Sequence, residues 1–250
     1  MTSSGAPFSN AAKNLRQLAG SPASWSLALL VLAVQLAVTL AGGREIEPAA
    51  TWFQQLGFSR SGFLGGHVWQ TFTYGLLHGS WTHAGLNALF LLLIGSRVEH
   101  ITGSRSTVAV VFVGVVSGGL AHLALSSGTD GRSLLVGISG GCMALLLMLT
   151  TLSPQSRMMP LPVSGRSLGL GIMGAELILS LINPALRLPG FSAFGDILVE
   201  SGLGSWFILG HGCHFGGAVA GWFMARRVLR PRITLDRLRR DRERREAKSS

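Results

Sequence analysis

The sequence predicts an all-α, polytopic membrane protein with six transmembrane helices. Only 13% of its 250 residues are charged and 48% are hydrophobic, whereas a soluble domain carries about a quarter charged residues. The charges fall almost entirely at the chain ends and in short connectors. Six apolar stretches approach the length of about 20 residues that a helix needs to cross a bilayer core. These predicted spans are residues 25–41, 84–98, 107–125, 134–152, 167–182 and 205–225, and the helix of the second is expected to extend back towards Trp81.

The spans divide the chain into one membrane domain between two charged ends. Residues 1–23 are predicted as a short cytoplasmic lead, 24–226 as the six-helix domain and 227–250 as a basic cytoplasmic tail. The first span follows two basic residues, as a secretory signal does. Because its apolar run is long and five more spans follow, we expect it to be retained as the first helix.

The distribution of basic residues predicts the orientation. Both ends of a six-span chain lie on one side, and that side collects seventeen Lys and Arg residues against four on the other. The positive-inside rule therefore places both termini in the cytoplasm. The Ala, Gly, Leu and Arg bias suits a bacterial plasma membrane. The tail holds most of the net charge of +10, with four acidic residues interspersed. A solvated or disordered end explains this charge without nucleic acid, and a lipid or partner contact is the alternative.

Two long connectors are expected on the outer side. The first outer connector, residues 42–81, is rich in glycine and in aromatic rings, which settle at headgroup depth. We therefore expect a membrane-embedded first loop; its rings include Trp52, Trp69, Tyr74 and Trp81. The second outer connector, residues 183–204, carries two prolines and three charges and is predicted to be a mobile loop.

Several polar side chains fall inside the predicted spans, where such groups are costly and usually functional. They are His83, Asn87, His122, Ser139, Glu176, His211 and His214. Ser139 is about five residues into span four and His214 about nine into span six, or about 7 and 13 Å below the helix starts. His83 and Asn87 lie in the first turns of span two. We therefore expect these four residues in one layer of the outer leaflet.

Ser139 lies between glycines, in the stretch Gly-Ile-Ser-Gly-Gly at 137–141. A serine hydroxyl is a weak nucleophile until a neighbouring base takes its proton, and small residues around it also suit plain helix packing. A lysine base is excluded, because the chain's two lysines, Lys13 and Lys248, lie in its ends. A serine–lysine dyad is therefore excluded, and the histidines in the spans are the next candidates for the base.

His214 is the favoured base. Gly217 and Gly221 follow it at i+3 and i+7, on the same helical face, and such a small-residue groove lets two helices approach closely. If the partner is span four, His214 reaches Ser139; otherwise a membrane histidine commonly makes an interhelical hydrogen bond. His211, one turn away, is an alternative base. His211 and His214 also have the spacing of a metal pair, but no HExxH motif accompanies them, so no metal is expected.

The remaining polar groups receive supporting roles. His83 and Asn87 share a helical face and both can donate hydrogen bonds to a developing oxyanion. No Asp or Glu stands at an obvious third position beside the histidine, so a Ser–His dyad is the simpler proposal. Glu176, the one carboxylate in the middle of a span, is expected to be structural, hydrogen-bonded and neutral.

Three motifs resemble the signatures of rhomboid proteases. His-Gly-Ser-Trp-Thr-His-Ala-Gly-Leu-Asn at 78–87, continuing to residue 104, resembles the second-helix signature. Gly-Ile-Ser-Gly at 137–140 resembles the nucleophile motif, and His-Phe-Gly-Gly-Ala-Val-Ala-Gly at 214–221 the sixth-helix motif. Their order and helix positions agree with the family over most of residues 65–225. The resemblance implies a rhomboid-like bundle.

The same resemblance implies an intramembrane serine endopeptidase that needs no cofactor and cuts transmembrane segments of other proteins near the outer face. Ser139 would be the nucleophile and His214 its base. Together with the Ser139 amide, the residues implied in binding the oxyanion and substrate are His83, Asn87, Ile138 and Gly140. Those implied in structural support are Glu99, Gly217 and Gly221.

Two departures from the family pattern concern support rather than chemistry. The family often has Trp-Arg in the first outer loop, where this chain has Trp69-Gln70, and an aromatic residue one turn after the serine, where it has Met143. Two alternatives stay open: a non-catalytic rhomboid relative that binds membrane clients, and a small transporter that uses Glu176. An aspartyl intramembrane protease is excluded, because residues 193–196 lack the first glycine of GxGD.

Overall fold

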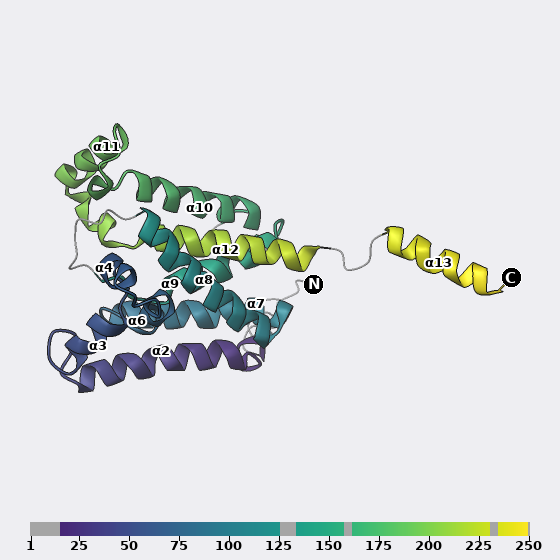
Figure 1. The fold of residues 1–250 in the computed structure, drawn as a ribbon, viewed down its shortest axis with the longest axis horizontal. Helices are drawn as coiled ribbons and strands as arrows, with labels where there is room; N and C mark the ends of the chain where they lie inside the picture. Colours follow the sequence, from purple (N-terminus) through teal and green to yellow (C-terminus); the bar gives the residue numbers. More distant parts are fainter. Residues whose placement is uncertain (1–15, 126–133, 158–161, 231–234, 250) are drawn as a thin grey trace, which may run out of the picture.

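The computed structural model describes residues 16–125, 134–157, 162–230 and 235–249. Their regular structure is helical (Figure 1), and within these ranges the only β-pairing is two isolated bridges. The predicted all-α class is therefore confirmed. Most of the predicted lead and part of the predicted tail lie outside the described residues.

Helices occupy the places of all the predicted spans in the described part of the chain (Figure 1). They are α2 (Pro22–Leu40); α6 (Trp81–Phe90), continued by the π-helical turn η2 (Leu91–Gly95) and α7 (Ser96–Thr102); α8 (Ser104–Leu125); α9 (Ser139–Leu152); α10 (Gly165–Leu181); and α12 (His211–Leu229). In the tail, α13 covers Leu235–Ser249.

Three of these helical segments are long and apolar enough to cross a membrane: α2, the continuous segment Trp81–Thr102, and α8. Helix α9 is apolar but has only 14 residues. Helices α10 and α12 contain polar and charged side chains, among them Glu176 and Arg226, which lower their apolar content. Among the described residues, three of the six predicted spans therefore have a helix that is long and apolar enough to cross a membrane.

Helices α8, α9 and α12 form the centre of the bundle, with α10 on one side and α2 and α6 on the other (Figure 1). Glycines allow these central helices to touch backbone to backbone. A Cβ atom added at Gly114 of α8 would overlap the Ala144 side chain of α9, and one added at Gly216 of α12 would meet the carbonyl oxygen of Ser117. Such small-residue contacts are typical of helix packing in membranes.

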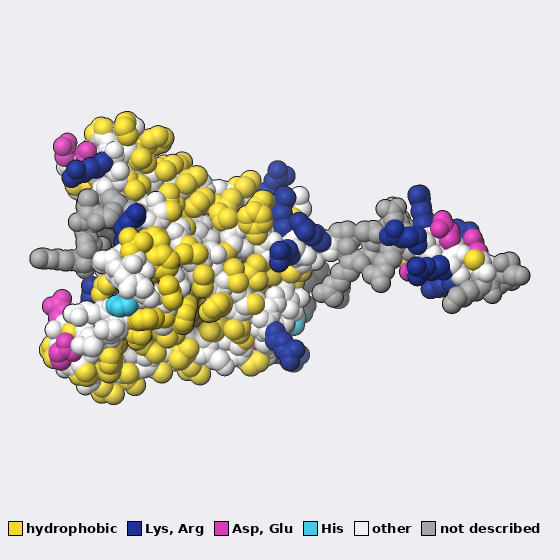
Figure 2. Space-filling view, in the orientation of Figure 1, with side chains coloured by type: hydrophobic (Ala, Val, Ile, Leu, Met, Phe, Trp, Pro, Cys, Tyr) yellow, Lys and Arg dark blue, Asp and Glu magenta, His cyan; other side chains and the backbone are white. Residues whose placement is uncertain are grey.

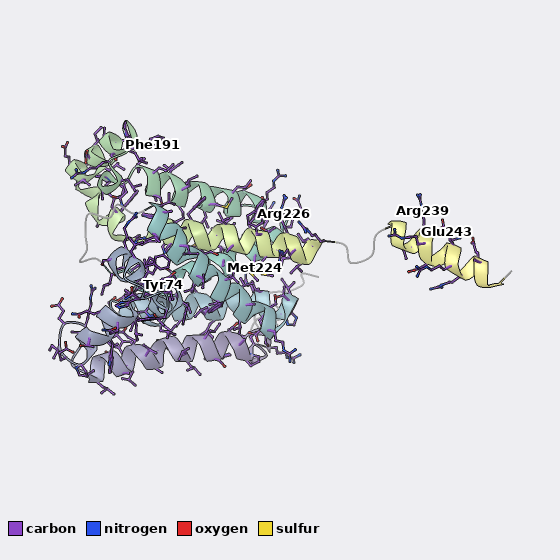
Figure 3. The ribbon with its side chains drawn as sticks, in the orientation of Figure 1. Tyr74, Phe191, Met224, Arg226, Arg239 and Glu243 are labelled. Carbon is purple, nitrogen blue, oxygen red and sulfur yellow. The ribbon has the colours of Figure 1, made fainter. Side chains whose placement is uncertain are left out.

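The bundle has two distinct ends and an apolar middle. Tyr74 and Phe191 lie toward the end that holds both outer connectors, here called the connector end, whereas Arg226 lies toward the opposite end (Figure 3). Apolar side chains cover much of the visible middle, with charged groups near the ends (Figure 2). Large apolar side chains remain exposed there, among them Leu29, Leu36, Phe112, Leu120 and Phe223. This surface suits contact with lipid.

The first outer connector folds into short helices that pack on the bundle. These are α3 (Ala49–Leu56), α4 (Arg60–Leu64), α5 (Gln70–Thr73) and η1 (Tyr74–Leu76). Phe58 pairs with Leu135 through two backbone hydrogen bonds of 3.1 and 2.9 Å. The Tyr74 hydroxyl donates to the carbonyl oxygen of Val115 at 2.7 Å, and the Tyr74 carbonyl accepts from Gly137 N–H at 3.0 Å. The connector therefore braces the segment that precedes α9.

The second outer connector differs from the predicted mobile loop, because most of it is helical. It contains η3 (Pro184–Leu186), α11 (Phe191–Leu198), η4 (Val199–Leu203) and η5 (Gly204–Ile208). On α11, Gly195 sits tightly against the backbone of Ile182, while Phe191, Phe194 and Ile197 are exposed. The two prolines mark the start of the connector, and the apolar residues that follow them form this helix.

Glu99 of α7 lies at the beginning of α2. Its carboxylate accepts hydrogen bonds from the backbone N–H groups of Ala23 and Ser24, both at 2.9 Å, and from the Ser24 hydroxyl at 2.8 Å. The Ser104 hydroxyl of α8 donates to it at 2.7 Å. The first N–H groups of a helix have no intrahelical acceptor, and a carboxylate there also interacts favourably with the helix dipole. Glu99 thus joins the starts of α2 and α8 to α7.

Candidate active site

Ser139 and His214 are in direct contact at the connector end. His214 Nε2 lies 2.9 Å from Ser139 Oγ. Ser139 is the first residue of α9, and His214 is in the first turn of α12. The expected depths of five and nine residues are wrong, because residues 134–138 are not helical and α12 begins only at His211. The Phe58–Leu135 bridge holds the segment before α9 in an extended conformation.

The close approach of α12 to α9 brings these two side chains together. A Cβ atom at Gly217 would overlap the carbonyl group of Gly140, and one at Gly221 would overlap that of Ala144. The helix packed on the glycine face of α12 is therefore α9, which corresponds to predicted span four. Since His214 lies one turn before Gly217, the glycine contact sets its distance from Ser139.

Asn87 and His83 of α6 face the loop that leads to Ser139. Asn87 is buried, and its Nδ2 has no hydrogen-bond partner within the described residues, whereas its Oδ1 lies 3.7 Å from Cys142 Sγ. Gly137 has a φ of 115°, which favours glycine. A Cβ atom there would lie 2.7 Å from the His83 ring and 3.6 Å from Asn87 Nδ2. A free amide donor therefore points to the region just before the serine.

Ile138 and Gly140 flank the serine in different ways. Ile138 is the N-cap residue of α9 and is buried. Gly140 is tightly packed: a Cβ atom added to it would lie 3.0 Å from the carbonyl oxygen of Gly114 and 3.0 Å from Cys213 Sγ. The N–H of Gly141 donates to the Ile138 carbonyl at 2.8 Å, so the candidate backbone donor beside Ser139 Oγ is the N–H of Ser139 itself, the first residue of α9.

Glu176 of α10 is the contact that sequence reasoning missed. One carboxylate oxygen, Oε1, lies 3.1 Å from His214 Nδ1, and the other, Oε2, lies 2.6 Å from His211 Nδ1. His211 Nε2 lies 2.9 Å from the carbonyl oxygen of Trp206. The sequence predicted no carboxylate beside His214, whereas the packing of α10 on α12 brings Glu176 next to it. The sequence feature that could have indicated this contact is one carboxylate in an apolar span together with two histidines in the next span.

Residues 65–231, more than half of the chain, match the family model of the Rhomboid domain. The chain belongs to the rhomboid family. Human rhomboid-related protein 3 is a relative with 38% identity over 79 residues, which are 32% of this chain and 19% of that protein. This match therefore spans about a fifth of the relative's length. The family and the apolar helices together make the chain an integral membrane protein.

Gln70 stands where rhomboids often have arginine, and it still braces the first outer connector. It is buried, its Oε1 accepts from the Ser59 N–H at 3.3 Å, and its Nε2 donates to the Gln54 carbonyl at 3.2 Å. The neighbouring Trp69 donates from Nε1 to the Gln55 carbonyl at 2.9 Å. Amide hydrogen bonds thus connect α5 to the end of α3 in this rhomboid.

Met143, the second departure from the rhomboid pattern, lies one turn after Ser139 on α9. It packs beside a buried cluster made by Leu146, Leu147 and Ala218, together with Phe90. A flexible thioether can fill an irregular gap between helices. The position is therefore part of the apolar packing between α9, α12 and the end of α6.

The residues Glu176, His211 and His214 also form the one group of three or more potential metal ligands found among the described residues. Their candidate ligand atoms all lie within 4.8 Å of one another. Two histidines and a carboxylate are a ligand set that zinc accepts. The hydrogen bonds already described use the same atoms, so the geometry is also complete without an ion.

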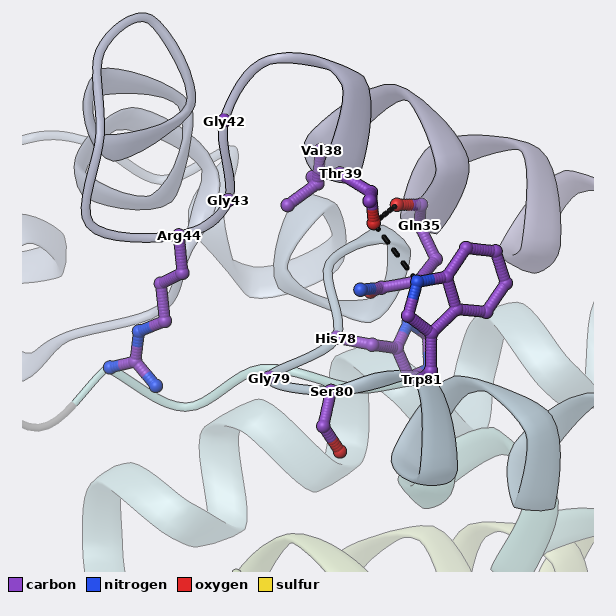
Figure 4. Close-up of a pocket in the computed structure, with 10 residues that line it drawn as sticks. All are labelled: Gln35, Val38, Thr39, Gly42, Gly43, Arg44, His78, Gly79, Ser80 and Trp81. Atoms are coloured by element: carbon purple, nitrogen blue, oxygen red, sulfur yellow. Dashed lines mark hydrogen bonds between the residues drawn. The ribbon is translucent and has the colours of Figure 1, made fainter.

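An open pocket of about 410 Å³ lies beside the site, between the end of α2 and the start of α6 (Figure 4). Gln35, Arg44, His78 and Trp81 are among the residues that line it. Gln35 Oε1 and both ring nitrogens of His78 are buried and have no hydrogen-bond partner within the described chain. The His78 ring contacts the His83 ring, with centroids 4.9 Å apart. The pocket has room for water, and these unpartnered atoms offer it hydrogen bonds, one side chain away from His83.

Proposed function

We propose that this rhomboid is an intramembrane serine endopeptidase that cleaves transmembrane segments of other membrane proteins near the outer face. The observation that carries the proposal is the distance of 2.9 Å between Ser139 Oγ and His214 Nε2. A nucleophile and a base within hydrogen-bond reach are the signature of an activated serine. The free Nδ2 of Asn87 adds a donor where an oxyanion would need one.

The proposed reaction uses groups of this chain and water. His214 Nε2 takes the proton of Ser139, whose Oγ bonds to the carbonyl carbon of the scissile peptide. Asn87 Nδ2, the His83 ring and the backbone N–H of Ser139 stabilise the oxyanion. His214 then returns the proton to the leaving amine as the C–N bond breaks, which leaves an acyl ester on Ser139. Water, deprotonated by His214, hydrolyses this ester and restores the serine.

The site's location supports a substrate that lies in the membrane. Ser139 is at the head of an apolar helix, and both outer connectors lie at the same end of the bundle (Figure 1). We place this end on the outer side and both termini in the cytoplasm, as the distribution of basic residues predicts, and the Ala, Gly, Leu and Arg bias of the sequence suits a bacterial cell. The partners are then transmembrane protein substrates and the lipid bilayer. The pocket lined by His78, next to His83, is a candidate source of hydrolytic water.

Two rival functions predict different behaviour. A non-catalytic rhomboid that binds membrane clients has no need for a base within reach of a serine, whereas here the two are in contact. A transporter that uses Glu176 needs a carboxylate that is free to bind and release its cargo. Both oxygens of Glu176 are already occupied by histidines, which favours the peptidase.

The test combines covalent labelling with cleavage. Purified protein is treated with a fluorophosphonate probe, and the modified residue is mapped by mass spectrometry. In parallel, the protein is reconstituted in liposomes with a transmembrane reporter substrate. We expect Ser139 to be labelled and the reporter to be cut. Both activities should disappear in Ser139→Ala and His214→Ala and persist in His100→Ala, whose exposed side chain serves as the control. Folded wild-type protein that is neither labelled nor active would contradict the proposal.

A further inference from the structure

Glu176 connects two histidines of α12 through its two carboxylate oxygens. His214 Nδ1 lies 3.1 Å from Oε1, and His211 Nδ1 lies 2.6 Å from Oε2. The side chains of all three residues are largely shielded from solvent. With the contact between His214 and Ser139, a continuous hydrogen-bonded chain runs from α10 to α9.

The hydrogen bonds determine where the protons lie. A backbone carbonyl oxygen can only accept, so the Nε2 that faces Trp206 must carry a proton. The proton between His211 Nδ1 and Glu176 Oε2 is then shared by the pair. Wherever it resides, the Glu176–His211 pair has no net charge. This neutrality matters, because an unpaired carboxylate in a membrane domain is costly.

The same reasoning sets the tautomer of His214. With the proton of the pair on its Oε2 side, Glu176 Oε1 is an acceptor, so His214 must donate from Nδ1. Its Nε2 then has a free lone pair and faces the Ser139 hydroxyl at 2.9 Å. This is the tautomer that a general base needs. When His214 takes the serine proton, the carboxylate of Glu176 stabilises the imidazolium.

We propose that Glu176, neutralised by His211, is a positioning residue that holds His214 in its basic tautomer and converts a Ser–His dyad into a hydrogen-bonded chain of four residues. The inference rests on the proposed peptidase function. Glu176 acts through His214 and does not touch the substrate. A transition metal shared by the same three residues is the competing use of the cluster.

Two substitutions separate orientation from charge. Glu176→Ala removes the acceptor, so His214 can rotate or take the wrong tautomer. Glu176→Gln keeps an oxygen for His214 Nδ1, while its amide N–H₂ can donate to His211 Nδ1. Gln therefore preserves the geometry but lacks the carboxylate charge. The matched control is Glu200→Gln, an exposed carboxylate in the second outer connector.

The experiment measures kcat and KM separately for each variant with the reporter in liposomes, and thermal unfolding in detergent. We expect Glu176→Ala to lower kcat by about 10- to 100-fold, since a positioned base contributes at least this much. KM should change less than about twofold, because the substrate does not contact Glu176. Glu176→Gln should fall between Ala and wild type, and Glu200→Gln should match wild type.

Other outcomes overturn the proposal in distinct ways. A wild-type kcat in folded Glu176→Ala, or a loss confined to KM, would show that Glu176 does not position the base. Abolition of wild-type cleavage by a metal chelator, reversed by added zinc, would assign the cluster to a metal. If wild type itself shows no Ser139-dependent cleavage, the peptidase function fails, and the positioning role of Glu176, which rests on it, fails with it; active wild type with unaffected Glu176→Ala overturns the role of Glu176 alone.

Discussion

Gly217 of α12 packs directly on the backbone of Gly140, the residue that follows Ser139. No side chain separates the two helices at this level, so their spacing is set by the backbone itself. Because Ser139 and His214 are carried by these helices, their contact of 2.9 Å depends on the glycine pair. Packing and the candidate chemistry therefore share the same few residues.

The first prediction tests this dependence with Gly217→Ala. The added methyl group overlaps the Gly140 carbonyl, so α12 must move away from α9. We expect a destabilisation of about 1–3 kcal/mol, the usual cost of overpacking, and a loss of cleavage greater than about tenfold. The control is Gly171→Ala on α10, where a Cβ atom meets nothing within 4 Å. Equal activity in the two variants would show that α9 and α12 tolerate a wider spacing.

The second prediction concerns the free amide of Asn87. Its Nδ2 is buried without a hydrogen-bond partner among the described residues, as expected for a donor that meets its acceptor only during the reaction. Removing one oxyanion donor typically lowers kcat by about 10²–10³-fold. We expect this loss in Asn87→Ala, with little change in KM, and near wild-type kinetics in the control Asn183→Ala. A change in KM alone would instead indicate a role in substrate binding.

Much of this arrangement could be predicted from the sequence, for definable reasons. Apolar stretches of sufficient length predict the helices. His83, Asn87, Ser139 and His214 lie in recognisable motifs near helix starts, so their shared layer follows from the alternating direction of the spans. The glycines after His214 predict a close helix contact. These inferences depend on local patterns and on topology.

The role of Glu176 could not be predicted in the same way. No motif surrounds this residue, and its contacts with His211 and His214 depend on how α10 crosses α12, which a sequence pattern does not encode. The predicted starts of the fourth and sixth spans lie before the observed starts of α9 and α12 for a related reason. Apolar residues such as Leu135 extend the hydrophobic pattern that predicts a helix. In the structure, a backbone bridge between Leu135 and Phe58 keeps Leu135 out of the helix.

The third prediction tests Glu99 as a helix cap. Glu99→Gln replaces one acceptor oxygen by an N–H₂ group that faces the backbone N–H groups of α2. Loss of a charged hydrogen bond to a buried donor costs about 1–3 kcal/mol, so the midpoint of thermal unfolding in detergent should fall. The matched control is Glu45→Gln, which changes an exposed carboxylate. If both variants unfold at the wild-type temperature, the cap contributes little to stability.

The fourth prediction concerns pH and His78, which lies just before the start of α6. Burial, and next the neighbouring His83, lower the pKa of His78 from 6.5 to about 4. Arg44 lines the same cavity and adds a further positive group. The folded protein therefore keeps His78 neutral in a pH range where the unfolded chain protonates it. Stability should be unaffected by this residue above pH about 6.5 and should fall as the pH drops from there toward about 4.

The expected size of this loss is about 2 kcal/mol between pH of about 7.5 and about 5. It is measured as the fall in the unfolding midpoint in detergent between those two conditions. His78→Gln removes the titrating group from the buried position, so its midpoint should fall less than that of wild type. The control His100→Gln removes an exposed histidine and should keep the wild-type response. An unchanged response in His78→Gln would mean that protonation of His78 is as favourable in the folded protein as in the unfolded chain, which its burial beside His83 argues against.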